Sequence, residues 1–303
     1  MLDDRIAPML AYAGMPFDSP RHLFEIKWDG TRCLLFLRGR DIRLQNRRLE
    51  DITARYPELA RIPQGVRARN AILDGELVVL AQGRPDFGKL QQREQVSSPL
   101  KIELLSRQLP ATYIVFDLLF LNDARCLEAP LRERKGLLKG ILRESPHLVE
   151  SRYIQEKGKS FFKEVVDQGL EGIMAKALDS PYLIGKRSRF WLKIKPRGRA
   201  ACYIVGYTPG KGGRAGTFGA LAVAAVAEGA WVYRGLVGSG FSDAALTDLT
   251  SRLKALRVDA PPIPLKTHVA GITWVRPELR CEVTFQEPTA RGRFRAPAFK
   301  RLL

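Results

Sequence analysis

The sequence predicts an α+β domain over residues 1–196, followed by an all-β barrel domain over residues 197–303. Long apolar runs and amphipathic helical patterns alternate in the first part, whereas short strands with glycine-rich turns fill the second. The segment Pro196-Arg-Gly-Arg between them has the composition of a hinge. A chain of 303 residues, 45% of them hydrophobic, is long and apolar enough for two folded domains.

The charge balance favours a polyanionic partner. The chain has 50 lysines and arginines against 32 aspartates and glutamates, a formal net charge of +18. Cationic surfaces gain affinity for nucleic acid by releasing counterions from its phosphates. An anionic membrane surface is the alternative, but we find no basic amphipathic helix that could bind one. We therefore expect a nucleic-acid partner.

No segment of the sequence is typical of a membrane span, a secretory signal or a zinc site. No apolar run reaches the length of a bilayer, and the N-terminus lacks a charged head before an apolar stretch, so we expect a cytoplasmic protein. The cysteines and histidines lack metal-ligand spacing, so we expect reduced thiols and no zinc site. These residues are Cys33, Cys126, Cys202, Cys281, His22, His147 and His268.

The first domain is expected to begin with an irregular lead-in over residues 1–24, which carries three prolines. Apolar and alternating runs then predict strands, and apolar residues at helical spacing predict short helices. The expected strands are Phe24–Leu37 with a turn inside it, Asp41–Asn46, Ala71–Leu80, Tyr113–Leu121, Leu170–Lys176 and Trp191–Pro196. The expected helices lie around Tyr56, from Phe87, over residues 130–145 and over Phe161–Gln168, before Gly169.

The rest of the first domain is organised around the stretch Glu25–Arg32. It holds Lys27 between the acids Glu25 and Asp29, with Arg32 five residues beyond the lysine. A lysine that loses its proton is a nucleophile, and burial shifts a lysine pKa readily. The alternative interpretation is a surface turn with an ordinary solvated lysine, so the downstream motifs have to decide between the two.

A second signal lies in the strand Trp191–Pro196. Lys193 and Lys195 are two residues apart and point to one face of the strand, while Leu192 and Ile194 point to the other. Like charges on one face repel, so a strand carries them most readily where an anion sits between them. The pair therefore predicts a strand that faces phosphate.

The second domain combines short strands with one helix, for which Ser242 is the expected N-cap and Leu256 the end. The expected strands are Ala201–Tyr207, Ala220–Ala227, Ala230–Val237, Gly271–Val275 and Leu279–Phe285. Such a set matches a small Greek-key barrel of the oligonucleotide-binding (OB) type. The loop 210–219, with Lys211 and Arg214, suits contact with a phosphate chain, although a flexible hairpin has the same composition.

The stretch Glu25–Arg32 resembles the nucleotidyl-transfer motif of ATP-dependent DNA ligases. The flanking sequence is similar to the ligase module of the bacterial multifunctional end-joining ligases, from about residue 20 to residue 300. The resemblance implies an adenylation (nucleotidyltransferase) domain with antiparallel sheets ahead of the OB-fold barrel. Further residues match the family's motifs in the family's order: Arg47, Glu76, Phe116, Glu171, Lys193 and Lys195.

The resemblance also implies a mechanism and a role for each residue. Lys27 attacks ATP and keeps AMP, AMP passes to the 5′-phosphate at a nick, and the 3′-hydroxyl displaces AMP to seal the strand. Cofactor binding is implied for Glu25, Arg32, Arg47, Glu76, Phe116, Lys193 and Lys195, with Phe116 stacking on adenine. Binding of Mg²⁺ or Mn²⁺ is implied for Glu76 and Glu171. Contact with nucleic acid is expected for Arg32, Arg47, Lys211, Arg214 and Arg295.

One departure from the family's pattern lies at the end of the chain. The family continues Arg-x-Pro-x-Phe into an Arg-x-Asp-Lys segment that engages the pyrophosphate of ATP, whereas here Arg295-Ala-Pro-Ala-Phe299 is followed only by residues up to Leu303. We therefore expect slow loading with ATP and a smaller effect on the sealing of pre-adenylated DNA.

The expected substrate is nicked double-stranded DNA, bound by a monomer near the nucleoid, with an end-binding repair protein as a further partner. An RNA ligase or a capping-type guanylyltransferase would use the same lysine chemistry and would differ in the nucleotide or strand that it accepts. A non-catalytic nucleic-acid-binding module would explain the charge and the barrel, but not Lys27 together with the two glutamates.

Overall fold

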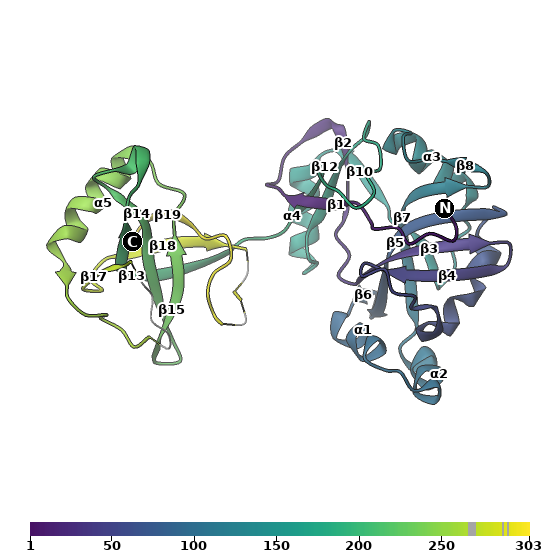
Figure 1. Cartoon of the computed structure of the whole chain (residues 1–303), viewed down its shortest axis with the longest axis horizontal. Helices are drawn as coiled ribbons and strands as arrows, with labels where there is room; N and C mark the ends of the chain where they lie inside the picture. The colour runs from purple at the N-terminus through teal and green to yellow at the C-terminus, as the bar shows by residue number, and fades with distance from the viewer. Residues whose placement is uncertain (266–270, 287, 290) are drawn as a thin grey trace. The chain divides into compact units, whose positions relative to one another are not determined.

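The computed structural model describes residues 1–265, 271–286, 288–289 and 291–303, so His268 lies outside the described residues. The chain divides into two compact units, Met1–Lys195 and Pro196–Leu303 (Figure 1). The sequence predicted the boundary after residue 196, so the two boundaries lie one residue apart.

One sheet of the first unit carries Lys27 at the end of a strand. Its five strands run in the order β1-β12-β11-β2-β10. Helix α4 (Gly158–Asp167) packs on one face, where Val165 meets Phe24 and Ile173 in a small apolar core. The strands are β1 (Leu10–Ala13), β2 (Ser19–Ile26), β10 (Tyr153–Glu156), β11 (Ile173–Ala177) and β12 (Arg187–Ile194).

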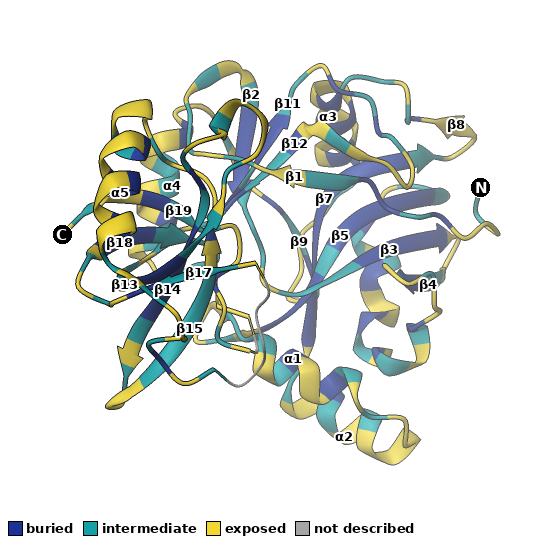
Figure 2. Ribbon diagram, turned by 60° about the vertical axis from the view of Figure 1, so that its left-hand side comes forward, coloured by how far each residue is buried: buried dark blue, intermediate teal, exposed yellow. Residues whose placement is uncertain are grey.

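The second sheet of this unit has seven strands with a central order β4-β3-β5-β7-β8, and β6 and β9 pair at its margins. Its long central strands are buried over most of their length (Figure 2). The strands are β3 (Thr31–Arg38), β4 (Asp41–Asn46), β5 (Asn70–Ala81), β6 (Arg84–Pro85), β7 (Ala111–Leu121), β8 (Ala124–Arg125) and β9 (Leu148–Glu150). The strand expected at Tyr113–Leu121 is buried up to Leu119 and partly exposed at its last two residues.

Two β-bulges turn aromatic side chains towards the space between the sheets. Opposite Ala11 and Tyr12 of β1, strand β12 jumps from Ser188 to Leu192, so that Trp191 lies in the inserted stretch. On β7 the register jumps between Asp117 and Val115, which leaves Phe116 out of the pairing with β5. A bulge re-aims the side chain it carries. Both rings are buried in a shared cluster with Met9 and Tyr182.

The helices of the first unit depart from the sequence prediction in two places. The helix expected over residues 130–145 is α3 (Leu131–Ile141), which begins after Pro130 and ends early. The helix expected around Tyr56 consists of two 3₁₀ segments instead, η1 (Thr53–Arg55) and η2 (Pro57–Gly65). Pro63 inside η2 removes a backbone donor and prevents a regular α-helix. Helix α1 (Phe87–Glu94) begins where expected, and α2 (Pro99–Gln108) was not predicted.

The irregular lead-in expected for residues 1–24 is also partly wrong. Strand β1 lies within it, and β2 begins at Ser19 rather than at Phe24. Strand β1 pairs in parallel with β12, which lies far along the chain. Because the partner is so distant in sequence, the short pattern of β1 carries no local sign of the pairing.

The described residues of the second unit form a paired β-structure with one α-helix. Its strands follow the order β15-β14-β13-β17-β16, with β18 on β13 and β19 on β18. Helix α5 (Asp243–Ala255) begins at the expected N-cap, where Ser242 Oγ accepts from the backbone N–H of Ala245 at 3.3 Å. The elements are β13 (Gly198–Pro209), η3 (Gly212–Arg214), β14 (Phe218–Ala227), β15 (Ala230–Val237), β16 (Arg257–Val258), β17 (Thr273–Val275), β18 (Arg280–Phe285) and β19 (Ala298–Leu302).

The core of the second unit lies between the strands and α5. Leu249 and Leu253 of the helix meet Ile204, Val223 and Val283 of three strands. Strand β19 was not predicted from the sequence. Within the described part of the chain, no helix is long and apolar enough to cross a membrane.

Candidate active site

Lys27 lies in the turn between β2 and β3. Its backbone N–H donates to the carbonyl oxygen of Gly172 at 2.9 Å, which ties the turn to the segment before β11. Gly30 approaches β5 so closely that an added Cβ would lie 2.1 Å from the carbonyl oxygen of Leu77. Position 30 therefore requires glycine if the turn is to hold Lys27 against both sheets.

The ammonium group of Lys27 contacts the carboxylate of Glu171. Lys27 Nζ lies 2.5 Å from Glu171 Oε2, and the two side chains are 23% and 18% exposed. Lys195 pairs with the other carboxylate oxygen, Oε1. Lys193 lies on β12 in register with Met174 of β11. The structure thus brings three of the residues singled out by their sequence motifs into one cluster: Lys27, Glu171 and Lys195.

Arg32, at the start of β3, is held by Asp74 of β5. Its Nε donates to Asp74 Oδ1 at 2.5 Å, and its Nη2 donates to Oδ2 at 2.6 Å. The Tyr182 hydroxyl donates to the same Oδ2 at 2.6 Å. Asp74 is fully buried, so its charge depends on these partners. Burial and the nearby Asp74 raise the pKa of Tyr182 well above its usual value, so its hydroxyl remains a donor.

Phe116 lies between two cations. The guanidinium carbon of Arg32 is 4.6 Å from the centre of its ring, and Lys176 Nζ is 4.1 Å from it. Lys176 Nζ also lies 4.4 Å from the ring centre of Trp191, whose ring meets Phe116 edge-on at 6.3 Å. Phe116 is only 7% exposed, so a base that stacks on it has to take the place of one of these cations.

Glu25 is buried and forms ion pairs with two lysines. One carboxylate oxygen pairs with Lys135 of α3, and the other lies 2.6 Å from Lys176 Nζ. Burial lowers the pKa of Lys176, and the nearby Glu25 opposes that effect. The side chain of Glu25 thus fixes the cation that lies against Phe116.

Glu76 faces Arg32 across the pairing of β3 with β5. Burial raises the pKa of its carboxyl group to about 7, against the opposing attraction of Arg32 and Lys27. No group of three or more metal-ligating side chains occurs among the described residues. The carboxylates of Glu76 and Glu171 suit a hard cation such as Mg²⁺ or Mn²⁺, which takes its other ligands from phosphate and water.

Four further residues were expected to bind phosphate or nucleic acid: Arg47 in the first unit, and Lys211, Arg214 and Arg295 in the second. Arg47 is exposed in the turn after β4, and Lys211 and Arg295 are exposed in the second unit. Arg214 is half-buried, and its Nη1 donates to the carbonyl oxygens of Gly219 and Gly238 at 3.1 Å each. This arginine holds its own loop in place, as a structural residue does.

Four further residues of the site were missed in the sequence. Asp74 stands beside Glu76 in Asp-Gly-Glu, and Lys176 ends an expected strand, so both had a local signal. Tyr182 and Lys135 had none, because their partners Asp74 and Glu25 are distant in sequence. A buried carboxylate requires cations and donors, but a single sequence does not show which ones supply them.

The family described as "ATP dependent DNA ligase domain" matches residues 8–195, and "ATP dependent DNA ligase C terminal region" matches residues 214–302. The chain is 32% identical over 302 residues to the multifunctional non-homologous end joining protein LigD of Mycolicibacterium smegmatis. That alignment covers 98% of this chain and 38% of the relative, so this chain spans less than half the length of that protein.

Two solved structures cover almost the whole chain. The ligase domain of M. tuberculosis LigD has 29% identity and a TM-score of 0.59, covering 99% of this chain and 96% of that one. A mycobacterial DNA ligase D complexed with ATP and MES has 30% identity and a TM-score of 0.57, with the same coverage. The predicted fold class, an adenylation domain followed by an OB fold, is confirmed. The chain belongs to the family of ATP-dependent DNA ligases.

Proposed function

We propose that this chain seals nicks in double-stranded DNA with ATP, through an AMP intermediate on Lys27. The observation that carries the proposal is the ion pair of Lys27 with Glu171, at the end of the sheet that also carries Lys195. A solvated surface lysine needs no such environment. A nucleophile does, because it has to be oriented and has to lose a proton.

In the first step, Lys27 Nζ attacks the α-phosphorus of ATP, and the bond to pyrophosphate breaks as the N–P bond forms. Glu171 Oε2, 2.5 Å from Nζ, is placed to receive the proton that the ammonium loses. Lys193 and Lys195 lie on and just beyond the adjacent strand β12 and would stabilise charge on the phosphate oxygens. AMP then passes to the 5′-phosphate, and the 3′-hydroxyl displaces it.

Glu76 and Glu171 would hold the divalent cation, which supplies charge stabilisation at the phosphates when bound. In the structure both oxygens of Glu171 are paired with lysines, whereas the carboxyl group of Glu76 is attracted by the charges of Arg32 and Lys27. Converting Lys27 to its AMP adduct removes the ammonium charge and leaves Oε2 of Glu171 without that partner.

The base of ATP would lie against Phe116 and displace Lys176 from the ring. Lys176 Nζ would then donate to an acceptor on the edge of the base, while Glu25 keeps the ammonium close. Stacking supplies affinity for any flat base, and a directed donor adds selectivity. This arrangement supports the proposed binding of adenine.

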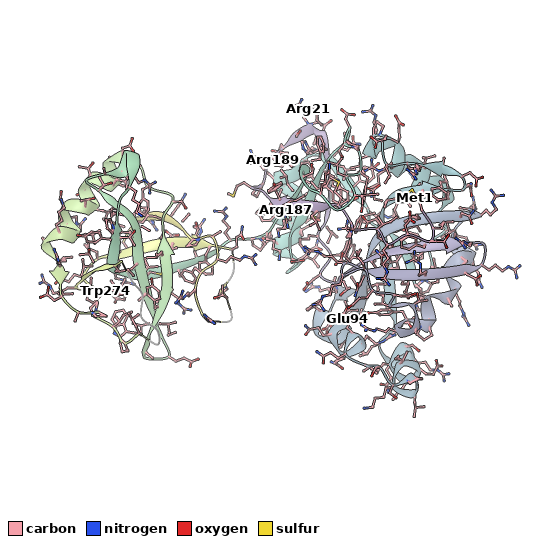
Figure 3. The ribbon with its side chains drawn as sticks, in the orientation of Figure 1. Met1, Arg21, Glu94, Arg187, Arg189 and Trp274 are labelled. Carbon is pink, nitrogen blue, oxygen red and sulfur yellow. The ribbon has the colours of Figure 1, made fainter. Side chains whose placement is uncertain are left out.

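The DNA would be bound through basic surfaces of both units. Arg187 and Arg189 of β12 lie 5.8 and 5.7 Å from the ring centre of Tyr12 on the adjacent strand β1. Figure 3 shows their side chains with that of Arg21 on the surface of the first unit. Arginine beside an exposed aromatic ring is typical of contacts with nucleic-acid strands. Arg47, Lys211 and Arg295 are the further contacts proposed, and Arg214 would act mainly by holding the loop of Lys211.

We also propose that the chain works as a monomer in DNA end joining near the nucleoid, with an end-binding repair protein as partner. The proposal is supported by the similarity to LigD, which is named a multifunctional non-homologous end joining protein. The RNA-ligase and capping-enzyme alternatives are not favoured, because both family matches are to ATP-dependent DNA ligases.

Nick sealing tests the function. The chain, ATP and Mg²⁺ are incubated with a labelled nicked duplex, and products are separated on a denaturing gel. The proposal predicts sealed strand with the wild type and at least a 1,000-fold loss, on the order that covalent catalysis requires, with Lys27→Ala. Sealing that survives Lys27→Ala, or sealing of an RNA nick alone, would contradict the proposal.

A further inference from the structure

Two buried aspartates face each other across the central strands of the second sheet. Asp74 of β5 and Asp117 of β7 are register partners, and both are fully buried. Each is bound by an arginine through two hydrogen bonds, Asp74 by Arg32 and Asp117 by Arg134. Of these four residues, only Arg32 belongs to the proposed catalytic machinery.

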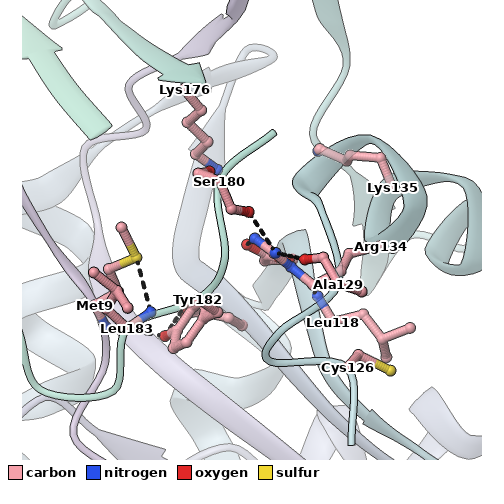
Figure 4. A network of polar contacts seen from close by, with 12 residues as sticks. Met9, Leu118, Cys126, Ala129, Arg134, Lys135, Lys176, Ser180, Tyr182 and Leu183 are labelled. Atoms are coloured by element: carbon pink, nitrogen blue, oxygen red, sulfur yellow. Dashed lines mark hydrogen bonds and ion pairs between the residues drawn. The ribbon is translucent and has the colours of Figure 1, made fainter. Parts of the chain in front are cut away.

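The segment from Ser180 to Leu183 connects the two pairs. Arg134 Nη1 donates to the carbonyl oxygen of Ser180 at 2.8 Å, so the Arg134–Asp117 pair fixes the start of the segment. The backbone N–H of Tyr182 donates to the carbonyl oxygen of Leu127 at 2.7 Å. The N–H of Leu183 lies 3.3 Å from the sulfur of Met9. Figure 4 shows the contacts of Arg134 with Ser180 and of Leu183 with Met9 on the two sides of Tyr182.

The hydroxyl of Tyr182 makes two hydrogen bonds, one as a donor and one as an acceptor. It donates to Asp74 Oδ2 at 2.6 Å and accepts from the backbone N–H of Met9 at 3.0 Å. Its ring is 2% exposed and meets Trp191 edge-on at 5.8 Å. A buried phenol so held has no freedom to rotate, so it transmits the position of its segment to the Asp74 carboxylate.

Asp74 in turn fixes the plane of the Arg32 guanidinium. Both oxygens are engaged by Arg32, and Oδ2 is shared with Tyr182. Without the Tyr182 hydroxyl, the Asp74 carboxylate would lack one of its three hydrogen-bond donors and could rotate about the bond that joins it to Cβ. The guanidinium follows such a rotation because a two-bond arginine–carboxylate contact keeps the groups coplanar.

We propose that Tyr182 is a positioning residue for ligation. Its hydroxyl, acting through Asp74, holds the guanidinium of Arg32 in a fixed orientation. In that orientation the edge of the guanidinium that faces away from Asp74 contacts the phosphate of the substrate. This inference rests on the proposed function, because it assigns Arg32 to the nick. Tyr182 itself touches neither ATP nor DNA. A purely structural Tyr182 would stabilise the fold and leave the geometry of Arg32 unaffected.

A double-mutant cycle separates the two roles. Tyr182→Phe removes the hydroxyl alone and is expected to slow single-turnover sealing of a pre-adenylated nick about tenfold, as the loss of one hydrogen bond to a charged group predicts. In an Arg32→Lys background, which keeps a cation beside Asp74 but loses the planar fork, the same change is expected to cost less than about twofold.

The matched control is Tyr113→Phe. The Tyr113 hydroxyl is also buried and donates to backbone carbonyl oxygens, lying 3.1 Å from that of Cys33 and 2.9 Å from that of Leu73. It belongs to the other core of the sheet, away from Phe116. Tyr113→Phe is expected to lower the melting temperature while sealing by the folded protein continues at the wild-type rate.

The outcomes are distinct. An equal slowing by Tyr182→Phe in both backgrounds, or no slowing in either, overturns the positioning role while wild-type sealing upholds the proposed function. Failure of the wild type to seal any nick overturns both. If Tyr182→Phe does not fold at the assay temperature, the cycle is run with Asp74→Asn in its place, where additivity with Arg32→Lys again contradicts the inference.

Discussion

Lys27 and Glu171 form an ion pair that contributes more to orientation than to stability. Both side chains are partly exposed, and such pairs stabilise a fold by only about 0–1 kcal/mol. The carboxylate accepts from Lys27 on one oxygen and from Lys195 on the other, which fixes its plane. Glu171 therefore orients Lys27 Nζ and is in contact with it as a proton acceptor.

Glu171→Gln tests that consequence. The amide keeps the shape of the side chain but is a poor proton acceptor, so we expect the rate of AMP transfer from ATP to Lys27 to fall about 100-fold. The rate is measured by rapid-quench labelling with α-labelled ATP. Glu164→Gln, an exposed position on helix α4, is the control and should keep the wild-type rate. A loss below about threefold with Glu171→Gln would show that this carboxylate is not the acceptor.

The sequence predicted the motif residues of the site, but not the residues that hold them in place. Lys27, Glu171 and Lys195 stand in recognisable local patterns, and the structure brings them together. Nothing in the neighbouring sequence marks Tyr182 or Lys135 as a site residue. In the folded chain Tyr182 is buried against Asp74, and Lys135 is buried against Glu25. A single sequence carries no signal for such long-range pairing.

Strands with a clear local apolar pattern were predicted well. Strands that form by pairing with a strand distant in sequence were predicted poorly. Strand β7 was evident from its apolar run, and α5 from its N-cap. Strand β1 was missed because its partner β12 lies far along the chain. The bulges that aim Trp191 and Phe116 leave no mark in the sequence either, since a bulge is a property of two paired strands.

The pairing of β13 with β18 makes a prediction about the thiols of the second unit. Cys202 and Cys281 are direct register partners and are fully buried. Burial raises the pKa of Cys202 to about 11 and that of Cys281 to about 12. Because the thiolate is the reactive form, both thiols should react with iodoacetamide at pH 8 at least 100-fold more slowly in the native than in the unfolded chain.

The sign of the pH effect on stability follows from the same shift. The folded state holds these protons more tightly, so the contribution of the two thiols to the free energy of unfolding should be constant below about pH 8 and fall as the pH rises above it. Urea titrations at several pH values, read against a Cys202→Ala and Cys281→Ala double variant, measure the contribution. Rapid native labelling at pH 8, or a variant with the same pH dependence, would contradict the burial of the pair.

For the whole molecule, the net charge of +18 favours binding to the phosphates of DNA. Each phosphate that a lysine or arginine neutralises adds about −0.9 to the slope of log affinity against log salt. Lys211→Ala should therefore reduce the magnitude of that slope by about 1 for a nicked duplex. Lys163→Ala is the control, because Lys163 is exposed and paired with Asp167 on α4. Fluorescence anisotropy at several salt concentrations gives both slopes, and an unchanged slope for Lys211→Ala would remove that residue from the DNA contacts.

The proposed reaction depends on a covalent bond between Lys27 and AMP, and radioactive labelling detects that bond. The chain is mixed with Mg²⁺ and ATP labelled at the α-phosphate, or with GTP labelled likewise, and run on a denaturing gel before mass spectrometry of its peptides. The account predicts label from ATP alone, on the peptide that contains Lys27, and none with Lys27→Ala. Label from GTP, label at another residue, or a chain that seals nicks without ever carrying AMP would contradict it.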